Sequence, residues 1–550
     1  MSLFEKHRER IERSVKANHE RGYHAAYSES PKGYDEHAQA EGLKQYQSFL
    51  NKKFSSLLQS DPSEWEGEES SPFTGELLGV KYPVYDMEAL IAGSKAAFSA
   101  WRKTTPQERA GILTESLEKI EEHFFEIAYA TQHTTGQSWI MSFQASGPHA
   151  ADRALEAIAM GYEQQMLFPA AAMWEKPMGK FSVKVEKTYT SMPRGIGLVI
   201  GCSTFPVWNS MPGLYANLIT GNTVILKPHP KAILPIAICV AAIQHTLREN
   251  GFDPHIVQLA SDTTLRPVTI ALAVHPDVKL IDYTGSTTFG DWIESLPHKI
   301  TFTEKAGVNS VIIDSVKDVD AMAQNLAFSL SLYSGQMCTA PQNFFIPEQI
   351  KSGDHILSHD EVAGKLKNAI TGLVNNPKLG AGILGAIQNE TTLERASGAG
   401  KLGGTMALES SNVKNEEFSN SRTVSPVLLE ASPADARIFE NELFGPIGIV
   451  IKTADTNESI KLAKDMAVQH GAITCAAYST DERVMKEIEE EMNEVFVPVT
   501  LNFTGPLWVN QHAAFSDLHG TGGNAAGNAS FTDQSFVVKR FVWIGNRKMI

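Results

Sequence analysis

The spacing of apolar residues predicts two successive amphipathic helices early in the chain. After Asp86, apolar positions recur at intervals that place them on one face of a helix; these positions are Met87, Leu90, Ile91, Phe98 and Trp101. The second helix is predicted to start in TPQERAGIL, where Thr105 can cap the helix, Pro106 takes the first helical position and Glu108 completes a capping box.

From about residue 194 to residue 300, short apolar runs rich in Val and Ile alternate with helical stretches. The strand-like runs are GIGLVI, TVILKP, HIVQLA and VKLIDYTGS, and the helical stretches are PVWNSMPGLYANLI, LPIAICVAAIQHTLREN and LRPVTIALAVH. This alternation predicts a parallel sheet covered by helices on both faces, with ligands at the carboxyl ends of the strands. A second series follows residue 304, from NSVIID to GAITCAAYS, and predicts a second α/β domain.

Three segments differ from both series. KFSVKVEKTYTSM (180–192) and SFVVKRFVWIGN near the C-terminus alternate apolar and polar residues, as exposed strands do. Unpaired strand edges invite pairing with another subunit, so we expect these segments to form an oligomerisation arm. The first 70 residues are polar and helix-prone and end in the acidic SDPSEWEGEESSP, which indicates a helical extension followed by a linker.

Composition narrows the class of protein. The 550 residues are 42% hydrophobic and 20% charged, as expected for a soluble globular protein of two or three domains. The net charge of −15 without a Lys/Arg-rich run argues against nucleic acid and anionic membranes as partners. The start, MSLFEKHRER, has no apolar segment of a secretory signal, and no apolar run approaches about 18 residues. A cytoplasmic enzyme is therefore expected.

The four cysteines are too few for a disulfide scaffold and lack metal-ligand spacing, so no metal site is predicted. Cys239 lies in an apolar helix and Cys475 in an apolar strand, where packing is the expected role. Cys338 stands in SLYSGQMCTAPQNFF, between a Gly-Gln pair and a Thr-Ala-Pro turn. On local composition it can be either a nucleophile or a packing residue.

Several further polar positions stand at turns or strand ends, and each is unremarkable alone. They are Glu304 in TFTEKAGVNSVIID, Glu442 in ENELFGPIGIVI, Thr284-Gly285-Ser286 in DYTGSTTFG and Lys227 in GNTVILKPHP. Each carboxylate alone is consistent with a solvated surface position. Their order and spacing along the chain carry more information.

Taken together, these sites closely resemble the aldehyde dehydrogenase superfamily, from Ser71-Pro72-Phe73-Thr74-Gly75-Glu76 almost to the C-terminus. Glu304 precedes Cys338 by 34 positions (338 − 304), the spacing between general base and nucleophile in that family. Gly335-Gln336-Met337-Cys338 looks like its G-Q-x-C motif, and Glu442-Leu443-Phe444-Gly445-Pro446 looks like its E-I-F-G-P motif. The N-terminal extension is most similar to the phenylacetate-degradation (PaaN-type) branch.

The resemblance implies an α/β fold of two doubly wound domains, one for cofactor binding and one catalytic, with a small β oligomerisation arm. The expected division is 1–70 for the N-terminal extension, 71–178 with 193–303 for the dinucleotide-binding domain, 304–515 for the catalytic domain, and 179–192 with 529–550 for the arm strands. Family habit also implies a homodimer or homotetramer.

The implied activity is oxidation of an aldehyde to a carboxylate. A cysteine thiolate attacks the aldehyde carbon, the thiohemiacetal loses hydride to a nicotinamide, and activated water hydrolyses the thioester. By resemblance, Cys338 is the nucleophile and Glu304 the general base of hydrolysis. We expect the amide groups around Cys338 and the cationic nicotinamide to favour its thiolate.

The resemblance also implies a set of cofactor-binding residues. Glu442 would hold the nicotinamide ribose, Lys227 the adenosine ribose, and Gly285 and Ser286 the pyrophosphate region. The full expected set is Lys227, His229, Lys231, Gly285, Ser286, Glu442 and Phe444. Many NAD-using members carry a glutamate where this chain has Pro230. Because no carboxylate would then repel a 2′-phosphate, NADP is predicted to be accepted and preferred over NAD.

Another departure concerns the oxyanion. The family usually carries P-W-N-F-P after the first strand, and its Asn donates to the oxyanion, whereas this chain reads GCSTFPVWNSMPG. Counting back from Gly221-Asn222 places Thr204 at the Asn position. Asn209 is close in sequence, but five helical residues turn it about 140° from the direction of Thr204. Thr204 is therefore the predicted donor.

The C-terminal loop FSDLHGTGGNAAG replaces the family's F-G-G-x-K-x-S-G and suggests a substrate of unusual size or charge. Its Gly/Asn-rich part, 519–528, is expected to be mobile. The substrate implied by the PaaN-type branch is a semialdehyde of aromatic-ring degradation, free or carried as a CoA thioester. Two alternatives stay open: a CoA-acylating dehydrogenase, which commonly lacks the base that Glu304 supplies here, and an inactive binding or scaffold protein.

Overall fold

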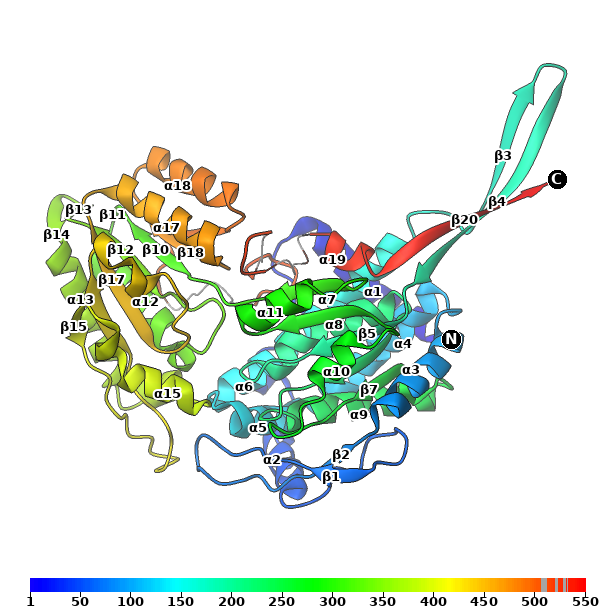
Figure 1. Cartoon of the computed structure of the whole chain (residues 1–550), viewed down its shortest axis with the longest axis horizontal. Helices are drawn as coiled ribbons and strands as arrows, with labels where there is room; N and C mark the ends of the chain where they lie inside the picture. The colour runs from blue at the N-terminus through cyan, green and yellow to red at the C-terminus, as the bar shows by residue number, and fades with distance from the viewer. Residues whose placement is uncertain (506–511, 520–522, 528–530, 532) are drawn as a thin grey trace.

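The computed structural model describes residues 1–505, 512–519, 523–527, 531 and 533–550. Two lobes face each other, and a long β-hairpin projects from one of them (Figure 1). Residues up to about 304 build the lobe that carries the hairpin, and most of the later residues build the other lobe. The predicted α/β fold with two doubly wound lobes is confirmed.

The first lobe contains a five-stranded parallel sheet in the order β7-β6-β5-β8-β9. Its strands are β5 (Ile196–Ile200), β6 (Thr223–Lys227), β7 (Val257–Leu259), β8 (Val278–Thr284) and β9 (Ile300–Glu304). Alternate side chains enter different cores: Val199 and Leu226 pack on one face, Leu198 and Ile225 on the other. Both faces are thus buried, which explains the continuous apolar runs in the sequence.

Helices surround this sheet and extend to the N-terminus of the chain. They are α1 (Leu3–Glu20), α2 (Ala38–Phe49), α3 (Met87–Trp101), α4 (Pro106–Glu121), α5 (Phe124–Thr135), α6 (Trp139–Ser146), α7 (Pro148–Gln165), α8 (Pro206–Ile219), α9 (Leu234–Glu249), α10 (Thr269–Val274) and α11 (Thr287–Glu294). The two helices predicted from the early pattern are α3, capped by Asp86, and α4, whose capping box is formed by Thr105 and Glu108 as predicted.

The second lobe contains a seven-stranded sheet in the order β15-β16-β17-β12-β10-β18-β19, parallel except for β15. Its strands are β10 (Ser310–Ile313), β12 (Asn343–Pro347), β15 (Thr405–Leu408), β16 (Val427–Ala431), β17 (Ile447–Thr453), β18 (Cys475–Tyr478) and β19 (Val499–Leu501). A small sheet joins β11 (Ser315–Val316), β13 (Gln349–Ser352) and β14 (His355–Ser358).

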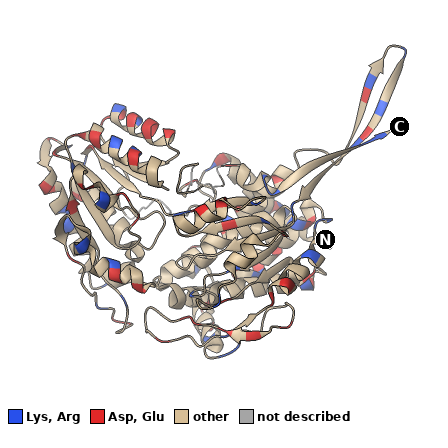
Figure 2. Cartoon of the chain, viewed as in Figure 1, with Lys and Arg blue, Asp and Glu red and all other residues tan. Residues whose placement is uncertain are grey.

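Helices cover both faces of the second sheet. They are α12 (Val319–Ser331), α13 (His359–Val374), α14 (Gly380–Leu384), α15 (Glu390–Ser397), α16 (Ala436–Phe439), α17 (Thr456–His470) and α18 (Glu482–Glu494). Acidic residues gather on α18, whereas Lys and Arg are interspersed with Asp and Glu over the rest of the visible ribbon (Figure 2). Within the described residues, no helix is both long and apolar enough to cross a membrane.

The prediction of a linker after the N-terminal extension is wrong. Glu64–Glu66 forms β1, which pairs with β2 (Tyr82–Val84). Glu69 is buried, and its Oε1 accepts hydrogen bonds from the amides of Ile233 (2.5 Å) and Leu234 (2.9 Å) at the start of α9. The acidic residues that suggested a solvated linker therefore include one that satisfies the end of a buried helix.

The projecting hairpin consists of β3 (Ala171–Met178) and β4 (Phe181–Pro193), and β20 (Phe541–Met549) pairs with β4 in the order β20-β4-β3. The arm sheet therefore begins at Ala171, eight positions before the start expected from sequence. Ser535–Val538, expected to be extended, forms the short helix α19 instead. Of the expected arm segment 529–550, positions 529, 530 and 532 lie outside the described residues.

Candidate active site

Cys338 follows α12 through a turn with unusual backbone geometry. Tyr333, Ser334 and Gly335 all have positive φ, at 51°, 50° and 62°. A Cβ on Gly335 would lie 2.3 Å from the Gly445 carbonyl oxygen, so only glycine fits between the two segments. The close approach locks the G-Q-M-C segment to the E-L-F-G-P segment, two motifs that are far apart in sequence.

The backbone of Cys338 is held by Asn309, which follows β9. Its Nδ2 donates to the carbonyl oxygens of Cys338 (2.8 Å) and Ala340 (3.1 Å). Its Oδ1 accepts from the amides of Ile473 (3.0 Å) and Thr474 (3.1 Å). The buried Asn309 amide thus uses four hydrogen-bonding positions, two toward the segment of Cys338 and two toward the residues before β18. Asn309 is a positioning residue that sequence reasoning missed.

Cys338, Glu304 and His519 form a compact cluster. The Cys338 Sγ lies 3.3 Å from His519 Nε2, and the same nitrogen lies 3.6 Å from Glu304 Oε1. Glu304 ends β9 and Cys338 follows α12, whereas His519 comes from the C-terminal loop. The sequence prediction paired Glu304 with Cys338 but missed His519, whose only signal was the departure of the loop from the family pattern.

The local environment holds the thiol protonated. Burial raises the pKa of Cys338 well above its ordinary value, and the nearby Glu304 carboxylate raises it further. Burial also lowers the pKa of the His519 imidazole, although Glu304 opposes this effect. The resting pair is therefore a neutral thiol beside a neutral imidazole, and the imidazole is free to accept the thiol proton.

Trp208 and Arg153 support the His519 ring. The Trp208 ring meets the His519 ring edge-on with centroids 4.8 Å apart, and the Arg153 guanidinium lies 4.1 Å from the Trp208 centroid. Arg153 is buried in α7, where burial lowers the pKa of its guanidinium and the charges of Glu156, Glu304 and Cys338 oppose this effect. A buried cation thus stands near the cluster.

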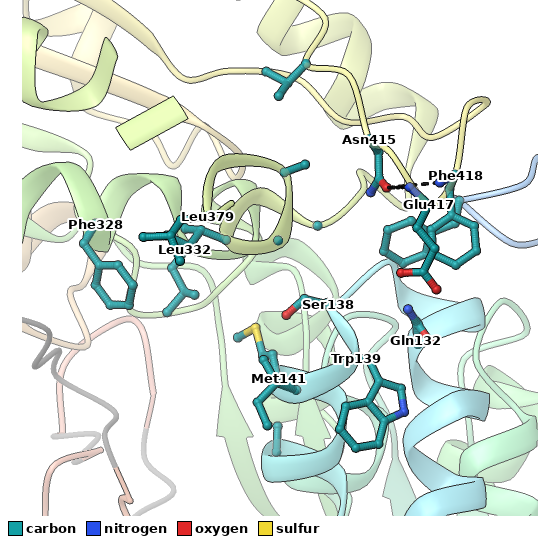
Figure 3. A pocket seen from close by; sticks show the side chains of 18 of the residues that line it. Gln132, Ser138, Trp139, Met141, Phe328, Leu332, Leu379, Asn415, Glu417 and Phe418 are labelled. Atoms are coloured by element: carbon teal, nitrogen blue, oxygen red, sulfur yellow. Dashed lines mark hydrogen bonds between the residues drawn. The ribbon is translucent and has the colours of Figure 1, made fainter. Parts of the chain in front are cut away.

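Cys338 opens onto a cavity of about 840 Å³. Trp139 and Met141 of α6 line one side, and the segment with Asn415, Glu417 and Phe418 lies at another (Figure 3). The amides of Glu417 (3.0 Å) and Phe418 (3.1 Å) donate to Asn415 Oδ1, which shapes that segment. The apolar part of the wall includes Phe73, Trp139, Met141, Phe328, Leu332 and Phe418. Such a space suits a large, mainly apolar substrate.

The carboxyl ends of β5, β6 and β8 point to the same edge of the five-stranded sheet, because these strands are parallel neighbours. There Ser286 is the N-cap of α11, but its side chain accepts no hydrogen bond from the first turn of the helix. The amides of that turn are therefore not capped by Ser286. The Gly285 amide donates to the Glu304 carbonyl (3.0 Å), which joins this edge to the catalytic cluster. Such an edge suits a dinucleotide.

The comparisons with known proteins agree with this geometry. Residues 63–529 match the model of the aldehyde dehydrogenase family. This chain belongs to the aldehyde dehydrogenase family. A crystal structure of an NAD-dependent aldehyde dehydrogenase from Burkholderia multivorans is 44% identical and has a TM-score of 0.97, with 100% of this chain and 99% of that chain covered.

More distant relatives share the same fold. The 1-pyrroline-5-carboxylate dehydrogenase 2 of Bacillus subtilis (strain 168) is 23% identical over 437 residues, which covers 76% of this chain and 78% of that protein. A structure of 1-pyrroline-5-carboxylate dehydrogenase from Thermus with bound NAD is 18% identical, has a TM-score of 0.75 and is matched over 96% of this chain and 99% of that chain.

In this aldehyde dehydrogenase, Lys227 ends β6 and is buried against a carboxylate. Its Nζ lies 2.7 Å from Asp262 Oδ1, with both side chains almost fully buried. Burial lowers the pKa of Lys227 and raises the pKa of Asp262, while each charge opposes the effect on its partner. The predicted NADP preference assumed that no carboxylate lies near the adenosine ribose, whereas Asp262 places one beside Lys227; the preference itself stays a prediction.

The two other predicted cofactor-binding residues of the Lys-Pro-His-Pro-Lys run, His229 and Lys231, also form hydrogen bonds. The Lys231 Nζ donates to Asn389 Oδ1 (2.8 Å), a residue of the second lobe. The Lys231 amide donates to His229 Nδ1 (3.2 Å), and burial together with Lys227 and Lys231 lowers the pKa of His229 to about 4. His229 is therefore a neutral ring, and Lys231 links the two lobes.

Glu442 and Phe444 lie in the segment that approaches Gly335. Burial raises the pKa of Glu442 to about 7, and its charge in turn helps to raise the pKa of Cys338. The Phe444 carbonyl accepts a hydrogen bond from Arg395 Nη1 (2.7 Å). The structure thus brings Glu442 close enough to Cys338 for its charge to act on the thiol.

Thr204 and Asn209 flank the thiol of Cys202. Thr204 is buried, and a hydrogen bond from its side chain counters the rise in the pKa of Cys202, which burial brings to about 11. The Cys202 Sγ donates to Asn209 Oδ1 (3.4 Å). Asn209, but not Thr204, lines the cavity that contains Cys338. The assignment of the oxyanion donor to Thr204 stays a prediction, and Asn209 is its competitor.

Proposed function

We propose that this aldehyde dehydrogenase oxidises a semialdehyde of aromatic-ring degradation, free or CoA-linked, to its carboxylate, as in the PaaN-type branch. One observation carries the proposal: the Cys338–His519–Glu304 cluster stands at the wall of a large cavity rich in aromatic side chains. The cluster supplies a nucleophile, a proton acceptor and a carboxylate. The cavity supplies apolar contacts for a ring or a chain of several carbons.

The first step uses the neutral thiol. As the Cys338 Sγ attacks the aldehyde carbon, its proton passes to His519 Nε2, 3.3 Å away. The imidazolium that forms is stabilised by Glu304, 3.6 Å from the same nitrogen. The carbonyl oxygen becomes the oxyanion of a thiohemiacetal, and a hydrogen-bond donor from Thr204 or Asn209 stabilises it.

The dinucleotide, NAD or NADP, accepts the hydride when bound. The residues at the sheet edge fit such a group, because α11 offers amides without a side-chain cap and Lys227 stands at the end of β6. Gly285, Ser286, Lys227 and Glu442 would hold it, with His229, Lys231 and Phe444 around them. Glu304 next removes a proton from water, the hydroxyl adds to the thioester carbon, and Cys338 leaves as the thiolate.

The proposal favours water over CoA as the acyl acceptor. Glu304 Oε1 is buried and makes no hydrogen bond to the described residues, so a lone pair is available for a water proton. A CoA-linked substrate is still compatible with the site, because the exposed Lys378 lines the cavity and can attract an anionic group.

The test is a panel of aldehydes that includes aromatic, aliphatic and CoA-linked semialdehydes, with NAD and NADP measured separately. Reduction of the dinucleotide should require Cys338, so Cys338→Ala should abolish it. Glu304→Gln should keep one turnover per active site and lose steady-state turnover, because the thioester forms but is not hydrolysed. A wild-type product that is an acyl-CoA rather than a carboxylate would overturn the hydrolytic assignment.

A further inference from the structure

Among the described residues, two groups of three side chains bring His, Cys or carboxylate donors within 4.8 Å of one another. One group is Cys338, His519 and Glu304, and the other is His7, Glu115 and Glu118. The second group already has a cation, because Lys6 Nζ lies 2.7 Å from Glu115 and 2.9 Å from Glu118. Within the described part of the chain, no lysine or arginine forms an ion pair with the first group, and the buried Arg153 guanidinium acts on Glu304 and Cys338 only through its charge.

The distances in the first group are close to those of a tetrahedral metal site. With zinc bonds of about 2.3 Å to sulfur and about 2.0–2.2 Å to nitrogen and oxygen, a sulfur and a nitrogen ligand lie roughly 3.5–3.6 Å apart, and a nitrogen and an oxygen ligand lie roughly 3.3–3.6 Å apart. The Sγ–Nε2 distance is 3.3 Å and the Nε2–Oε1 distance is 3.6 Å. The Cys338 Sγ and the Glu304 oxygen also lie within 4.8 Å of each other, so modest side-chain movements bring all three donors to one ion.

A second, independent observation concerns Glu304. Its side chain is only 8% exposed, and its Oε1, the atom that faces His519, makes no hydrogen bond within the part of the chain that the structure describes. A buried carboxylate oxygen without a hydrogen bond is costly, and a cation would satisfy it. Cys338 lines the cavity, which gives an ion a path from solvent and leaves room for a water as fourth ligand.

From this geometry we propose that Cys338, His519 and Glu304 form a binding site for Zn²⁺, which locks the nucleophile in an unreactive state. One thiolate, one imidazole and one carboxylate are a ligand set that suits zinc. Binding replaces the S–H bond with a Zn–S bond and releases one proton to solvent, without transfer of electrons. The inhibitory consequence rests on the proposed function of Cys338, whereas the binding itself does not.

The direct test titrates the chelator-treated full chain with Co²⁺, a spectroscopic substitute for zinc. We expect one Co²⁺ per chain with a thiolate-to-cobalt charge-transfer absorption, which Zn²⁺ then removes by displacement. Cys338→Ser should abolish the band. His519→Gln and Glu304→Gln should each weaken Zn²⁺ binding by at least about 10-fold, since loss of even a supporting residue has an effect of that size.

Two control variants remove similar groups elsewhere. Cys202→Ser removes a neighbouring thiol, and His7→Gln removes the histidine of the other group; both should leave Zn²⁺ affinity unchanged. The proposal is overturned if the wild-type chain binds no Co²⁺, if the band survives in Cys338→Ser, or if His519→Gln binds as tightly as the wild type.

Activity provides the second readout. Zn²⁺ should inhibit aldehyde oxidation at the concentrations that fill the site, and a chelator should restore it. A chain that binds Co²⁺ through Cys338 but oxidises no aldehyde keeps the metal site and refutes the proposed function. A chain that oxidises aldehydes but binds no metal keeps the proposed function and refutes the metal site.

Discussion

Two side chains compete to stabilise the oxyanion. The Thr204 hydroxyl forms a hydrogen bond with Cys202. The Asn209 side chain lines the cavity of Cys338, and it is its Oδ1, not its Nδ2, that Cys202 contacts. We therefore expect Asn209→Ala to lower kcat/KM by about 10²–10³-fold, the cost of losing one oxyanion donor. Thr204→Val should have a much smaller effect.

Steady-state kinetics of both variants on one aldehyde decide between them. The reverse order, with Thr204→Val the slower enzyme, would restore the assignment made from sequence. A burst of dinucleotide reduction in either variant separates slow hydride transfer from slow hydrolysis, because only slow hydrolysis leaves the first turnover fast.

The carboxylate of Asp262 is the residue from which we predict the preference between NAD and NADP. Its carboxylate neutralises Lys227 and would face the extra phosphate of NADP if Lys227 holds the adenosine ribose. The wild-type chain is thus expected to bind NAD more tightly than NADP. Asp262→Asn should tighten NADP binding by at least about 10-fold, because the repulsion of one buried charge is removed.

Direct titration of the chain with each dinucleotide, without aldehyde, measures this preference independently of catalysis. NAD affinity is the internal control, since it should change little in Asp262→Asn. If the wild-type chain binds NADP more tightly than NAD, the NADP preference predicted from Pro230 is supported and the role of Asp262 is contradicted.

At the scale of elements, the start of α9 depends on Glu69. Its Oε1 accepts two backbone amides and its Oε2 accepts the Tyr82 hydroxyl. Glu69→Ala would leave these donors buried without an acceptor, so the free energy of unfolding should fall by about 2–4 kcal/mol. Glu69→Gln keeps an acceptor for the amides and should lose less.

The same residue gives a pH dependence of known sign. Burial raises the pKa of Glu69 to about 7 in the folded chain. The contribution of protonated Glu69 to the free energy of unfolding is therefore fully present below the pKa of the unfolded state. It is lost as the pH rises through about 7. Melting temperatures of Glu69→Gln should change less than those of the wild type between about pH 5 and about pH 8. An equal change in both would show that other groups control this dependence.

Sequence reasoning succeeded where the interactions are local. Helix α4 could be predicted because Thr105 and Glu108 cap it within one turn. Glu69 could not be placed, because its partner Ile233 is 164 residues away and an acidic stretch ordinarily faces water. Local pattern says which residues share an element but not which distant amide a carboxylate will meet.

In the candidate site too, residues tied together by motif spacing could be predicted, whereas residues brought in from distant loops could not. Cys338 and Glu304 could be proposed together because motif spacing ties them in one chain order. His519 is 181 residues beyond Cys338 in a loop without periodicity, so no local pattern pointed to it. Asp262 had a usable signal that was missed: it follows β7, and parallel strands end at the same edge as Lys227.

For the whole molecule, the exposed arm sheet is the feature from which we predict assembly. Trp174 and Ile544 are 41% and 42% exposed on the three-stranded sheet, which projects away from both lobes (Figure 1). We expect the wild-type chain to be a homodimer or homotetramer, because exposed apolar strands of this kind pair with another copy. Trp174→Glu together with Ile544→Glu should dissociate it.

Light scattering coupled to size-exclusion chromatography measures the mass of each species. Tyr23→Glu is the matched control, because Tyr23 is an exposed aromatic residue, 78% accessible, that lies outside the arm. An unchanged mass for the arm double variant, or a monomeric wild type, would contradict the assembly role.

The long sequence separation between Cys338 and His519 also has a consequence for biosynthesis. The ribosome adds about 5–20 residues per second, so His519 emerges roughly 10–40 s after Cys338. Until then the growing polypeptide carries the thiol without the imidazole that accepts its proton in the proposed mechanism. An incomplete chain is therefore expected to react slowly with aldehydes, and full reactivity is expected only in the last seconds of translation.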